Sequence, residues 1–508
     1  MGQTRAKHTM ATQSASIMRG TLALGGALFL VTASQVKSAE PDPFDVCASL
    51  DATPSVQTKI EACSETIKQT IGNRAALKEN KDAEFLASTY AIRGFHKASI
   101  KDYEGAIADY LISIERGSKS PSVFYNLANA YRNFNKYEES IVNYKKSIEL
   151  KPDYLWALIN LGYSYKDLGD IDSAKVVISR AKKIDPDNLD VIHIDAILIG
   201  YSGDLDRSIS EFGKIIAQDP KRAGAYADRG WSLYQLRRFD DAIRDFDKAI
   251  SLAPANMAAY HNRAAVRLEK GDQEGGLADL NEALRLAPSN AKAVLDRALL
   301  FTRQGRNGEA DSEFDRALRM NPSLAPHAYA RRGKWWFDKQ NYDRAEQDFG
   351  KLVTLEPAVA DWVHLRGLAR YDAGRVKEGI GDYDAAARMD PENPTYQNSR
   401  CWGRALAGLE LDVALNACNQ AIARSPVSQQ RASFLDSRGR AHLARKEYAD
   451  ALSDYDAALL IAPKMSSALY GRGLARKQLN QPDGERDIRE ALLLDPAAAK
   501  HFSALDLG

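Results

Sequence analysis

Prolines that recur at a fixed interval limit the possible folds of this chain more than any other feature. Six of them lie 34 residues apart in succession: Pro152, Pro186, Pro220, Pro254, Pro288 and Pro322. With small changes in length, the series continues to Pro357, Pro391, Pro426, Pro463 and Pro496, and Ser118 holds the equivalent position before it. Self-similarity at such a period indicates a tandem array of one supersecondary unit, and twelve copies can be counted from Ala87 onwards.

Residues 223–256 form one complete copy and predict two helices. Apolar and small residues fall on one face of each half of this copy: Tyr226, Gly230 and Leu233 in the first half, and Ala242, Phe246 and Ala249 in the second. Their spacing of three and four residues is that of amphipathic helices. Pro254 ends the second helix, because proline has no amide hydrogen to donate and its ring clashes with the preceding turn.

Small residues recur where the two helices of a copy must approach closely. They are Gly94, Gly162, Gly230, Gly333, Gly367, Gly439 and Gly473 in the first helix, and Ala106, Ala174, Ala242, Ala310, Ala345, Ala414 and Ala451 in the second. Together with the period, this pattern resembles the tetratricopeptide repeat family. The resemblance implies an all-α fold, a right-handed α-solenoid superhelix of about twelve stacked helix-turn-helix repeats over residues 87–496. It also implies a binding scaffold, because many unrelated systems use the family in that way.

Residues 1–39 have the pattern of a secretory signal peptide. They contain no acidic residue, and Arg5, Lys7 and Arg19 precede an apolar run over residues 21–31. That run is shorter than the roughly 20 residues that a membrane-spanning helix needs. We therefore expect an exported protein without an integral membrane span once the signal is removed. The long basic lead also fits a mitochondrial presequence, which is the alternative localisation.

The four cysteines fall into two local pairs, Cys47 with Cys63 and Cys401 with Cys418. The second pair stands on the two facing helices of one copy, so the helix hairpin should bring its thiols face to face. Paired spacing behind an export signal favours two disulfides. The alternative is that all four are small buried hydrophobic side chains. A cysteine-paired hairpin followed by Arg-Gly repeats resembles exported bacterial members of the family, which implies the periplasm.

The segments on either side of the repeats are expected to cap them. Residues 40–86 would form an N-terminal capping hairpin and a linker, with a polar loop over residues 72–85. Residues 497–508 would form a closing C-terminal helix whose outer face can be polar. Such caps shield the otherwise open ends of a stack of repeats.

An arginine just before the small residue of the first helix is matched by an acid on the second helix, 16 residues later or 15 in the last copy. The eight pairs are Arg93 with Asp109, Arg229 with Asp245, Arg263 with Asp279, Arg297 with Glu313, Arg332 with Asp348, Arg366 with Asp382, Arg438 with Asp454, and Arg472 with Asp487. We predict an ion pair inside each hairpin, because arginine can bind a carboxylate bidentately at the edge of a helix interface. The alternative is a row of arginines that binds phosphate or nucleic acid. The balance of 69 basic and 68 acidic residues implies neither nucleic acid nor an anionic membrane as a partner.

In a solenoid of this family the first helices line the concave face, and a ligand would contact their inward side chains. From the second to the fifth copy these are Tyr125, Asn126, Asn129, Arg132, Trp156, Asn160, Tyr163, Lys166, His193, Tyr201, Trp231 and Tyr234. Aromatic rings with polar atoms can grip an extended peptide or a glycan chain. The alternative is that the aromatic residues pack between neighbouring repeats.

Catalysis finds no support in the motifs of this sequence. No nucleophile with a general base, phosphate-binding glycine loop or metal-ligand cluster stands outside the repeat pattern. We therefore predict a non-enzymatic scaffold, without a cofactor or metal, that binds a protein or an extended peptide. The alternative function is a binding subunit for a polysaccharide or cell-envelope assembly enzyme, with the aromatic residues on glycan.

Overall fold

The computed structural model describes residues 42–72, 80–426 and 429–503. These residues form 26 α-helices and two short 3-10 helices, and they contain no β-strand. No helix within these ranges combines the length and the apolar character needed to cross a bilayer. The all-α prediction is thereby confirmed. The predicted signal peptide, residues 1–39, lies outside the described residues.

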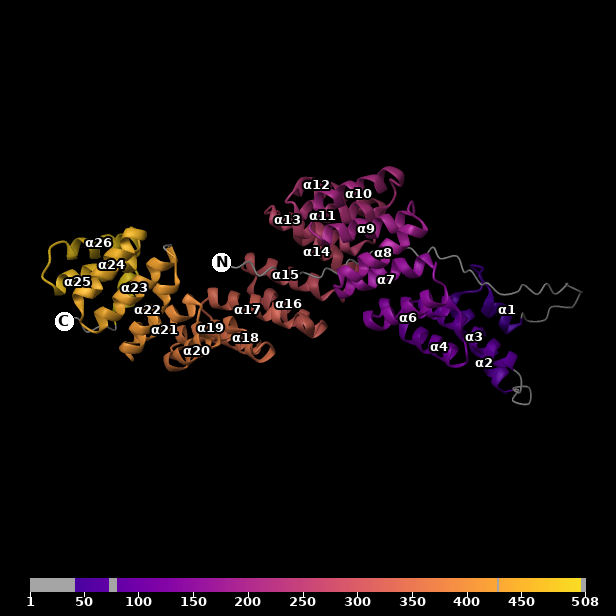
Figure 1. Cartoon of the computed structure of the whole chain (residues 1–508), viewed down its shortest axis with the longest axis horizontal. Coiled ribbons are helices and arrows are strands. Elements are labelled where there is room, and N and C mark those ends of the chain that lie inside the picture. Colours follow the sequence, from indigo (N-terminus) through magenta and orange to yellow (C-terminus); the bar gives the residue numbers. More distant parts are fainter. Residues whose placement is uncertain (1–41, 73–79, 427–428, 504–508) are drawn as a thin grey trace, which may run out of the picture. The chain divides into compact units, whose positions relative to one another are not determined.

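The helices form two compact units that divide between Pro288 and Ser289 (Figure 1). The first unit contains α1 (Pro43–Ala48), α2 (Val56–Gly72), α3 (Asn80–Ser99), α4 (Tyr103–Glu115), α5 (Pro121–Asn133), α6 (Tyr137–Leu150), α7 (Leu155–Leu168), α8 (Ile171–Ile184), α9 (Leu189–Tyr201), α10 (Leu205–Gln218), α11 (Ala223–Gln235), α12 (Phe239–Leu252), α13 (Met257–Glu269) and α14 (Gln273–Leu286). The second unit contains α15 (Ala291–Arg303), α16 (Asn307–Met320), η1 (Pro322–Leu324), α17 (Ala325–Asp338), α18 (Tyr342–Leu355), α19 (Ala360–Asp372), α20 (Val376–Met389), α21 (Pro394–Ala407), α22 (Leu411–Arg424), α23 (Gln429–Ala444), α24 (Tyr448–Ile461), α25 (Ser466–Gln478), α26 (Gly484–Leu494) and η2 (Ala498–Phe502).

Consecutive helices pair as hairpins, and each hairpin packs on the next one within its unit. An odd-numbered helix pairs with the even-numbered helix that follows it, from α3 with α4 up to α25 with α26. The second helix of a hairpin also contacts the first helix of the next, as α4 contacts α5 and α18 contacts α19. The twelve hairpins from α3 to α26 confirm the predicted number of repeats, and α1 with α2 forms a further hairpin before them.

The turn inside each of these twelve hairpins contains a residue in the left-handed region. The φ angle is 94° at Gly203 and 86° at Gly271, where glycine adopts this conformation without a steric penalty. The equivalent residue in α11–α12 is Arg237, with a φ angle of 59°. After the turn at Gly271, the carboxylate of Asp272 accepts a hydrogen bond of 2.8 Å from the amide of Gly275. This N-cap satisfies an otherwise unpaired amide, so the second helix can begin directly after the turn.

Aromatic rings of the second helices pack on the glycines of the first. A Cβ atom at Gly230 would lie 3.1 Å from the ring of Phe246, and one at Gly439 would lie 3.1 Å from the ring of Tyr455. Both rings are fully buried. The predicted close approach of the helices therefore exists, and a side chain at these glycines would have to push the ring away.

Both predicted cysteine pairs lie at bonding distance and join the two helices of a hairpin. The Sγ atoms of Cys47 on α1 and Cys63 on α2 are 2.11 Å apart. Those of Cys401 on α21 and Cys418 on α22 are 2.00 Å apart. All four side chains are fully buried. The hairpin geometry thus brings the thiols of each pair together as expected.

The segments that flank the repeats differ from the prediction in detail. A loop is predicted over residues 72–85, but α2 extends to Gly72 and α3 begins at Asn80, so the prediction is wrong for residue 72 and for residues 80–85, while residues 73–79 lie outside the described ranges. The early part of α3 makes a tertiary contact, because the ring centre of Phe85 lies 4.8 Å from that of Phe44 on α1. At the other end, the closing helix is the 3-10 helix η2, and residues 504–508 lie outside the described ranges.

Candidate functional site

The eight predicted ion pairs all form, each between the two helices of one hairpin. In α11 and α12, Nε and Nη2 of Arg229 donate to the two carboxylate oxygens of Asp245, both over 2.7 Å. Six other pairs share this bidentate geometry. In the remaining pair, Nε and Nη2 of Arg297 both donate to Oε2 of Glu313. The hydrogen bond to Asp245 raises the pKa of Arg229. These arginines are held by their own hairpins, which favours the structural role over phosphate or nucleic-acid binding.

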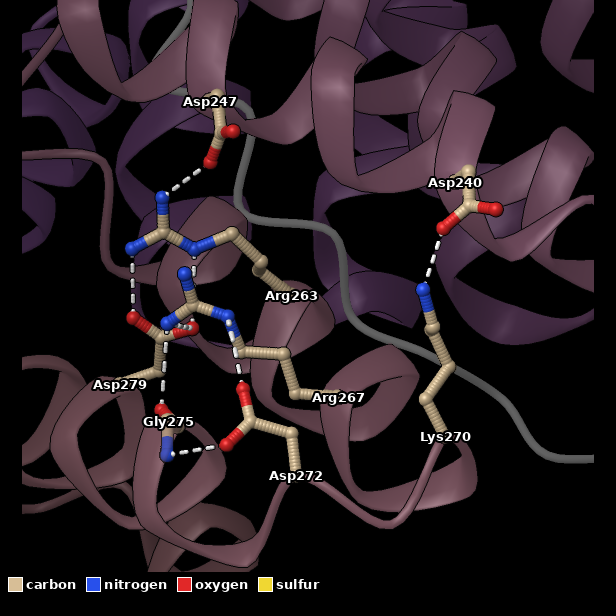
Figure 2. A network of polar contacts seen from close by, with 8 residues as sticks. All are labelled: Asp240, Asp247, Arg263, Arg267, Lys270, Asp272, Gly275 and Asp279. Carbon is tan, nitrogen blue, oxygen red and sulfur yellow. Dashed lines mark hydrogen bonds and ion pairs between the residues drawn. The ribbon is translucent and has the colours of Figure 1, made fainter.

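A second basic residue, four positions after the arginine, binds the same acid in several hairpins. Figure 2 shows one case, in which Nη1 of Arg267 donates to Oδ2 of Asp279 at 2.9 Å, beside Arg263. Nη1 of Arg263 also bonds to Asp247 of the preceding hairpin, so the network crosses from one repeat to the next (Figure 2). The same arrangement recurs with Lys97 at Asp109, Arg370 at Asp382 and Arg476 at Asp487. Sequence reasoning missed this second cation, although a basic residue four positions along a helix is a visible signal.

The predicted ligand contacts lie on α5, α7, α9 and α11, and we call their shared surface the first-helix face. Its first part is a network between two consecutive repeats. Nδ2 of Asn160 donates to Oδ1 of Asn129 at 2.9 Å and to the hydroxyl of Tyr125 at 3.1 Å. The hydroxyl of Tyr144 on α6 donates to the same Oδ1 at 2.5 Å. Three of the predicted residues, Tyr125, Asn129 and Asn160, are thus brought together and held in place.

The second part of the first-helix face is a cluster of two cations and one carboxylate. Nη2 of Arg132 on α5 lies 2.8 Å from Oδ2 of Asp167 on α7, and Nζ of Lys166 lies 2.7 Å from Oδ1. The guanidinium of Arg132 also lies 5.2 Å from the ring centre of Tyr163. Burial acts to lower the pKa of Arg132, but the charge and hydrogen bond of Asp167 together with the nearby Tyr144 and Tyr163 outweigh it, so this pKa lies above its ordinary value.

The third part joins α9 to α11 through a histidine. Nε2 of His193 lies 2.7 Å from Oδ2 of Asp228, and Nε of Arg222 donates to Nδ1 of His193 at 3.3 Å. Because Nδ1 accepts this bond, the ring proton belongs on Nε2, where it is donated to Asp228. Arg222 also pairs with Asp190. Arg222, Asp190 and Asp228 supply one cation and two carboxylates. Their net charge therefore balances that of the Arg132 cluster, which has two cations and one carboxylate.

The hydroxyl of Tyr163 stands within electrostatic range of both charged groups. Burial raises its pKa, and the carboxylates of Asp228 and Asp190 act in the same direction. The cations Arg132 and Arg222 act against that shift. Both groups therefore act on Tyr163 electrostatically.

The predicted contact residues differ widely in their exposure. Tyr201 is 40% exposed, and Trp231 is half-buried with its ring centre 5.1 Å from that of Tyr234. Tyr163, Lys166 and His193 are buried, and Asn126 is half-buried. Trp156 packs on the hydrophobic core, and Tyr125 lies against the ring of Tyr154 at 5.1 Å. Part of the aromatic set therefore packs between repeats, while the set's role in ligand binding stays a prediction.

Models of known protein families match a large part of the chain. A model described as TPR repeat matches residues 129–169. Two models described as tetratricopeptide repeat match residues 157–188 and, in five overlapping copies, residues 200–257, 227–291, 261–325, 295–353 and 336–394. None of the curated proteins matches this sequence.

Several solved structures have a similar fold. Cut9 in the APC/C hetero-tetramer Cut9–Hcn1 is 15% identical, with 91% of this chain and 93% of that chain covered and a TM-score of 0.42. A tetratricopeptide repeat protein from Parabacteroides merdae is 19% identical, with 50% and 99% covered and a TM-score of 0.37. PilF of Pseudomonas aeruginosa is 21% identical, with 41% and 94% covered and a TM-score of 0.35.

The family models and the repeating hairpins identify the same family for this chain. The matches together cover about half of its length, and paired helices continue through both units of the described residues. The chain belongs to the tetratricopeptide repeat family.

Proposed function

We propose that this protein is a non-enzymatic scaffold that binds an extended peptide segment of a partner protein along the first-helix face. The observation that carries the proposal is the bonding from repeat to repeat. Asn160 of α7 bonds to Tyr125 and Asn129 of α5, and His193 of α9 bonds to Asp228 of α11. Side chains that are already fixed lose little conformational entropy when a ligand binds. A row of such groups along consecutive helices suits a ligand that is itself a chain.

The charge of the first-helix face supports a peptide over a charged polymer. The face contains three cations and three carboxylates: Arg132, Lys166 and Arg222, with Asp167, Asp190 and Asp228. Because these charges balance, the face has no strong preference for an anionic or a cationic ligand. The more exposed rings of Tyr201, Trp231 and Tyr234 offer apolar contact area with polar atoms at the edge. That combination fits the alternating amide groups and side chains of a peptide.

We also propose that the protein is exported, to the periplasm of a bacterium. The support is the signal-like composition of residues 1–39 together with the two cysteine pairs at bonding distance. Disulfides persist in oxidising compartments and are rare in the cytosol. Fusing residues 1–39 to a reporter that is active only outside the cytoplasm tests this proposal, and a reporter that stays inactive would contradict it.

A fluorescence titration tests the proposed binding face. Capped, unstructured peptides should change the emission of Trp231, and Tyr234→Ala should weaken their binding about tenfold, because removing an aromatic anchor typically costs that much. Lys248→Ala is the matched control, since Lys248 is exposed on α12, the second helix of the same hairpin. Equal affinity for Tyr234→Ala and Lys248→Ala would remove the first-helix face as the site.

The same titration with glycan fragments tests the alternative function. If glycan fragments change the tryptophan emission and peptides do not, the protein is better explained as a binding subunit for a polysaccharide or cell-envelope assembly enzyme. If only peptides bind, that alternative fails.

A further inference from the structure

Arg440 on α23 is a buried cation without a hydrogen bond. Its side chain is 4% exposed, and none of its three guanidinium nitrogens has a partner among the described residues. Two residues earlier on the same helix, Arg438 donates to both carboxylate oxygens of Asp454 and to Asn419. The contrast matters because an unsatisfied buried polar group destabilises a protein, and more so when it is charged. Burial accordingly lowers the pKa of Arg440.

An unsatisfied acceptor stands one helical turn away from this unsatisfied donor. Oδ2 of Asp436 accepts a hydrogen bond of 3.0 Å from Ser467 on α25, while Oδ1 is buried without a partner in the described residues. Asp436 and Arg440 are four residues apart and so lie on the same face of α23. They act on each other electrostatically but form no ion pair within the described part of the chain. Burial raises the pKa of Asp436 to about 6, so the carboxylate is ionised at pH 7.5.

Aromatic residues enclose this donor and acceptor. The guanidinium of Arg440 lies 4.5 Å from the ring centre of Phe502 in η2. Tyr455 of α24, which is fully buried, has a hydroxyl without a hydrogen-bond partner in the described ranges and interacts electrostatically with both Asp436 and Arg440. A ring stacked on a guanidinium leaves the N–H groups free at its edge, because they point outward in its plane. Phe502 therefore covers Arg440 without satisfying its hydrogen bonds.

We infer that Arg440 and Asp436 form a binding site for a single amide group, from a peptide main chain or from an asparagine or glutamine side chain, and that Phe502 covers this site. The amide oxygen accepts a hydrogen bond from Arg440, and the amide N–H donates to Oδ1 of Asp436. Both unsatisfied groups then have partners. The site lies in the second unit and does not depend on the first-helix face.

The site offers a hydrogen-bond donor on Arg440 and an acceptor on Asp436, and this combination favours an amide over a carboxylate as the ligand. A carboxylate would satisfy Arg440, but it has no hydrogen to give to Oδ1 of Asp436 and would face a second negative charge. In the repeat frame, Arg440 holds the position of Trp231, two residues after the arginine of the ion pair. The site therefore belongs to the face of α23 that corresponds to the first-helix face.

Arginine side-chain resonances give a direct test in the full chain at pH 7.5. The probes are N-methylacetamide, which has both a donor and an acceptor, acetone, which has only the acceptor, and acetate, which has a charge. In the Phe502→Ala variant, N-methylacetamide should shift the Nε–H resonance of Arg440, and the change in chemical shift should reach a plateau as the concentration rises. The wild-type protein should need a higher concentration, because Phe502 covers the site. In Phe502→Ala with Asp436→Leu, the affinity for N-methylacetamide should fall about tenfold, to that of acetone, since one hydrogen bond to a charged group is lost.

Three results would overturn the inference. The first is an Arg440 resonance that no probe moves in Phe502→Ala, and the second is saturation by acetate at a lower concentration than by N-methylacetamide. The third is an affinity for N-methylacetamide that Asp436→Leu leaves unchanged. Phe502→Leu, which keeps an apolar side chain in η2, repeats the comparison if Phe502→Ala does not fold. Arg440→Lys identifies the Arg440 resonance by its disappearance.

Discussion

Replacing Arg229 by methionine should destabilise its hairpin more than the same change at Arg263. Both carboxylate oxygens of Asp245 accept hydrogen bonds from Arg229, and this carboxylate has a side-chain exposure of 9%. Arg229→Met would therefore leave a buried charge without its partner, a change that typically costs 3–5 kcal/mol. Because the Arg229 side chain is 25% exposed and water can reach the pair, we expect about 3 kcal/mol. Arg263→Met should cost about 1 kcal/mol, because Asp279 keeps its hydrogen bond from Arg267.

Native-state hydrogen exchange is the suitable assay, because repeat arrays open locally and need not unfold in one step. The free energy of opening is read from the amides of α12 for Arg229→Met and of α14 for Arg263→Met. The double variant Arg229→Met with Asp245→Leu should recover most of the loss, since removing both partners leaves no unpaired charge. The reasoning is refuted if the two single variants cost the same, or if the double variant is no more stable than Arg229→Met.

Three further predictions concern the turns, the cysteines and one histidine. Gly271→Ala should cost about 1 kcal/mol because of its positive φ angle, whereas Arg237→Gly, at the equivalent turn, should stabilise by a similar amount in the same exchange assay. Replacing Cys401 and Cys418 by alanine should lower the free energy of unfolding in oxidising buffer by about 3 kcal/mol, and an equal loss in reducing buffer would show that no disulfide is involved. Burial lowers the pKa of His364 to about 4, so the unfolded chain takes up a proton near pH 6.5 before the folded protein does. Stability should therefore fall by about 3 kcal/mol from pH 6.5 to pH 4, and His364→Gln should lack this part of the pH dependence in urea unfolding.

The fold was open to prediction because its determinants are local and repeated. Within a hairpin, Arg229 and Asp245 are 16 residues apart, and the same spacing recurs in most copies, so one regularity in the sequence identifies many contacts. The glycine of the first helix and the aromatic ring of the second repeat in the same way, as in Gly230 with Phe246. Twelve copies of a short pattern reveal helix packing that a single copy could not.

Contacts that occur only once in the chain could not be predicted from the repeat pattern. α3 begins at Asn80, and its Phe85 contacts Phe44 of α1, which lies outside the periodic pattern. The division into two units falls after Pro288, which continues the regular proline series without a break. On the first-helix face, the repeat pattern gave no sign that the ring of His193 is buried and bonded to Asp228, and its contact with a ligand stays a prediction.

Two arginines of α23 differ in their partners: one holds its hairpin together, and the other is buried without a hydrogen bond in the described part of the chain. The first is Arg438, whose partner Asp454 lies on the next helix at the repeated spacing. Arg440 stands two residues further on, which turns its side chain by about 200° around the helix and away from that partner. The repeat pattern supplies no acid to pair with it there, and Asp436 forms no hydrogen bond with it within the described residues. Arg440 is therefore a buried cation for which the repeat pattern supplies no partner. Residues that depart in this way from the pattern of a fold are concentrated at the sites where proteins bind their ligands.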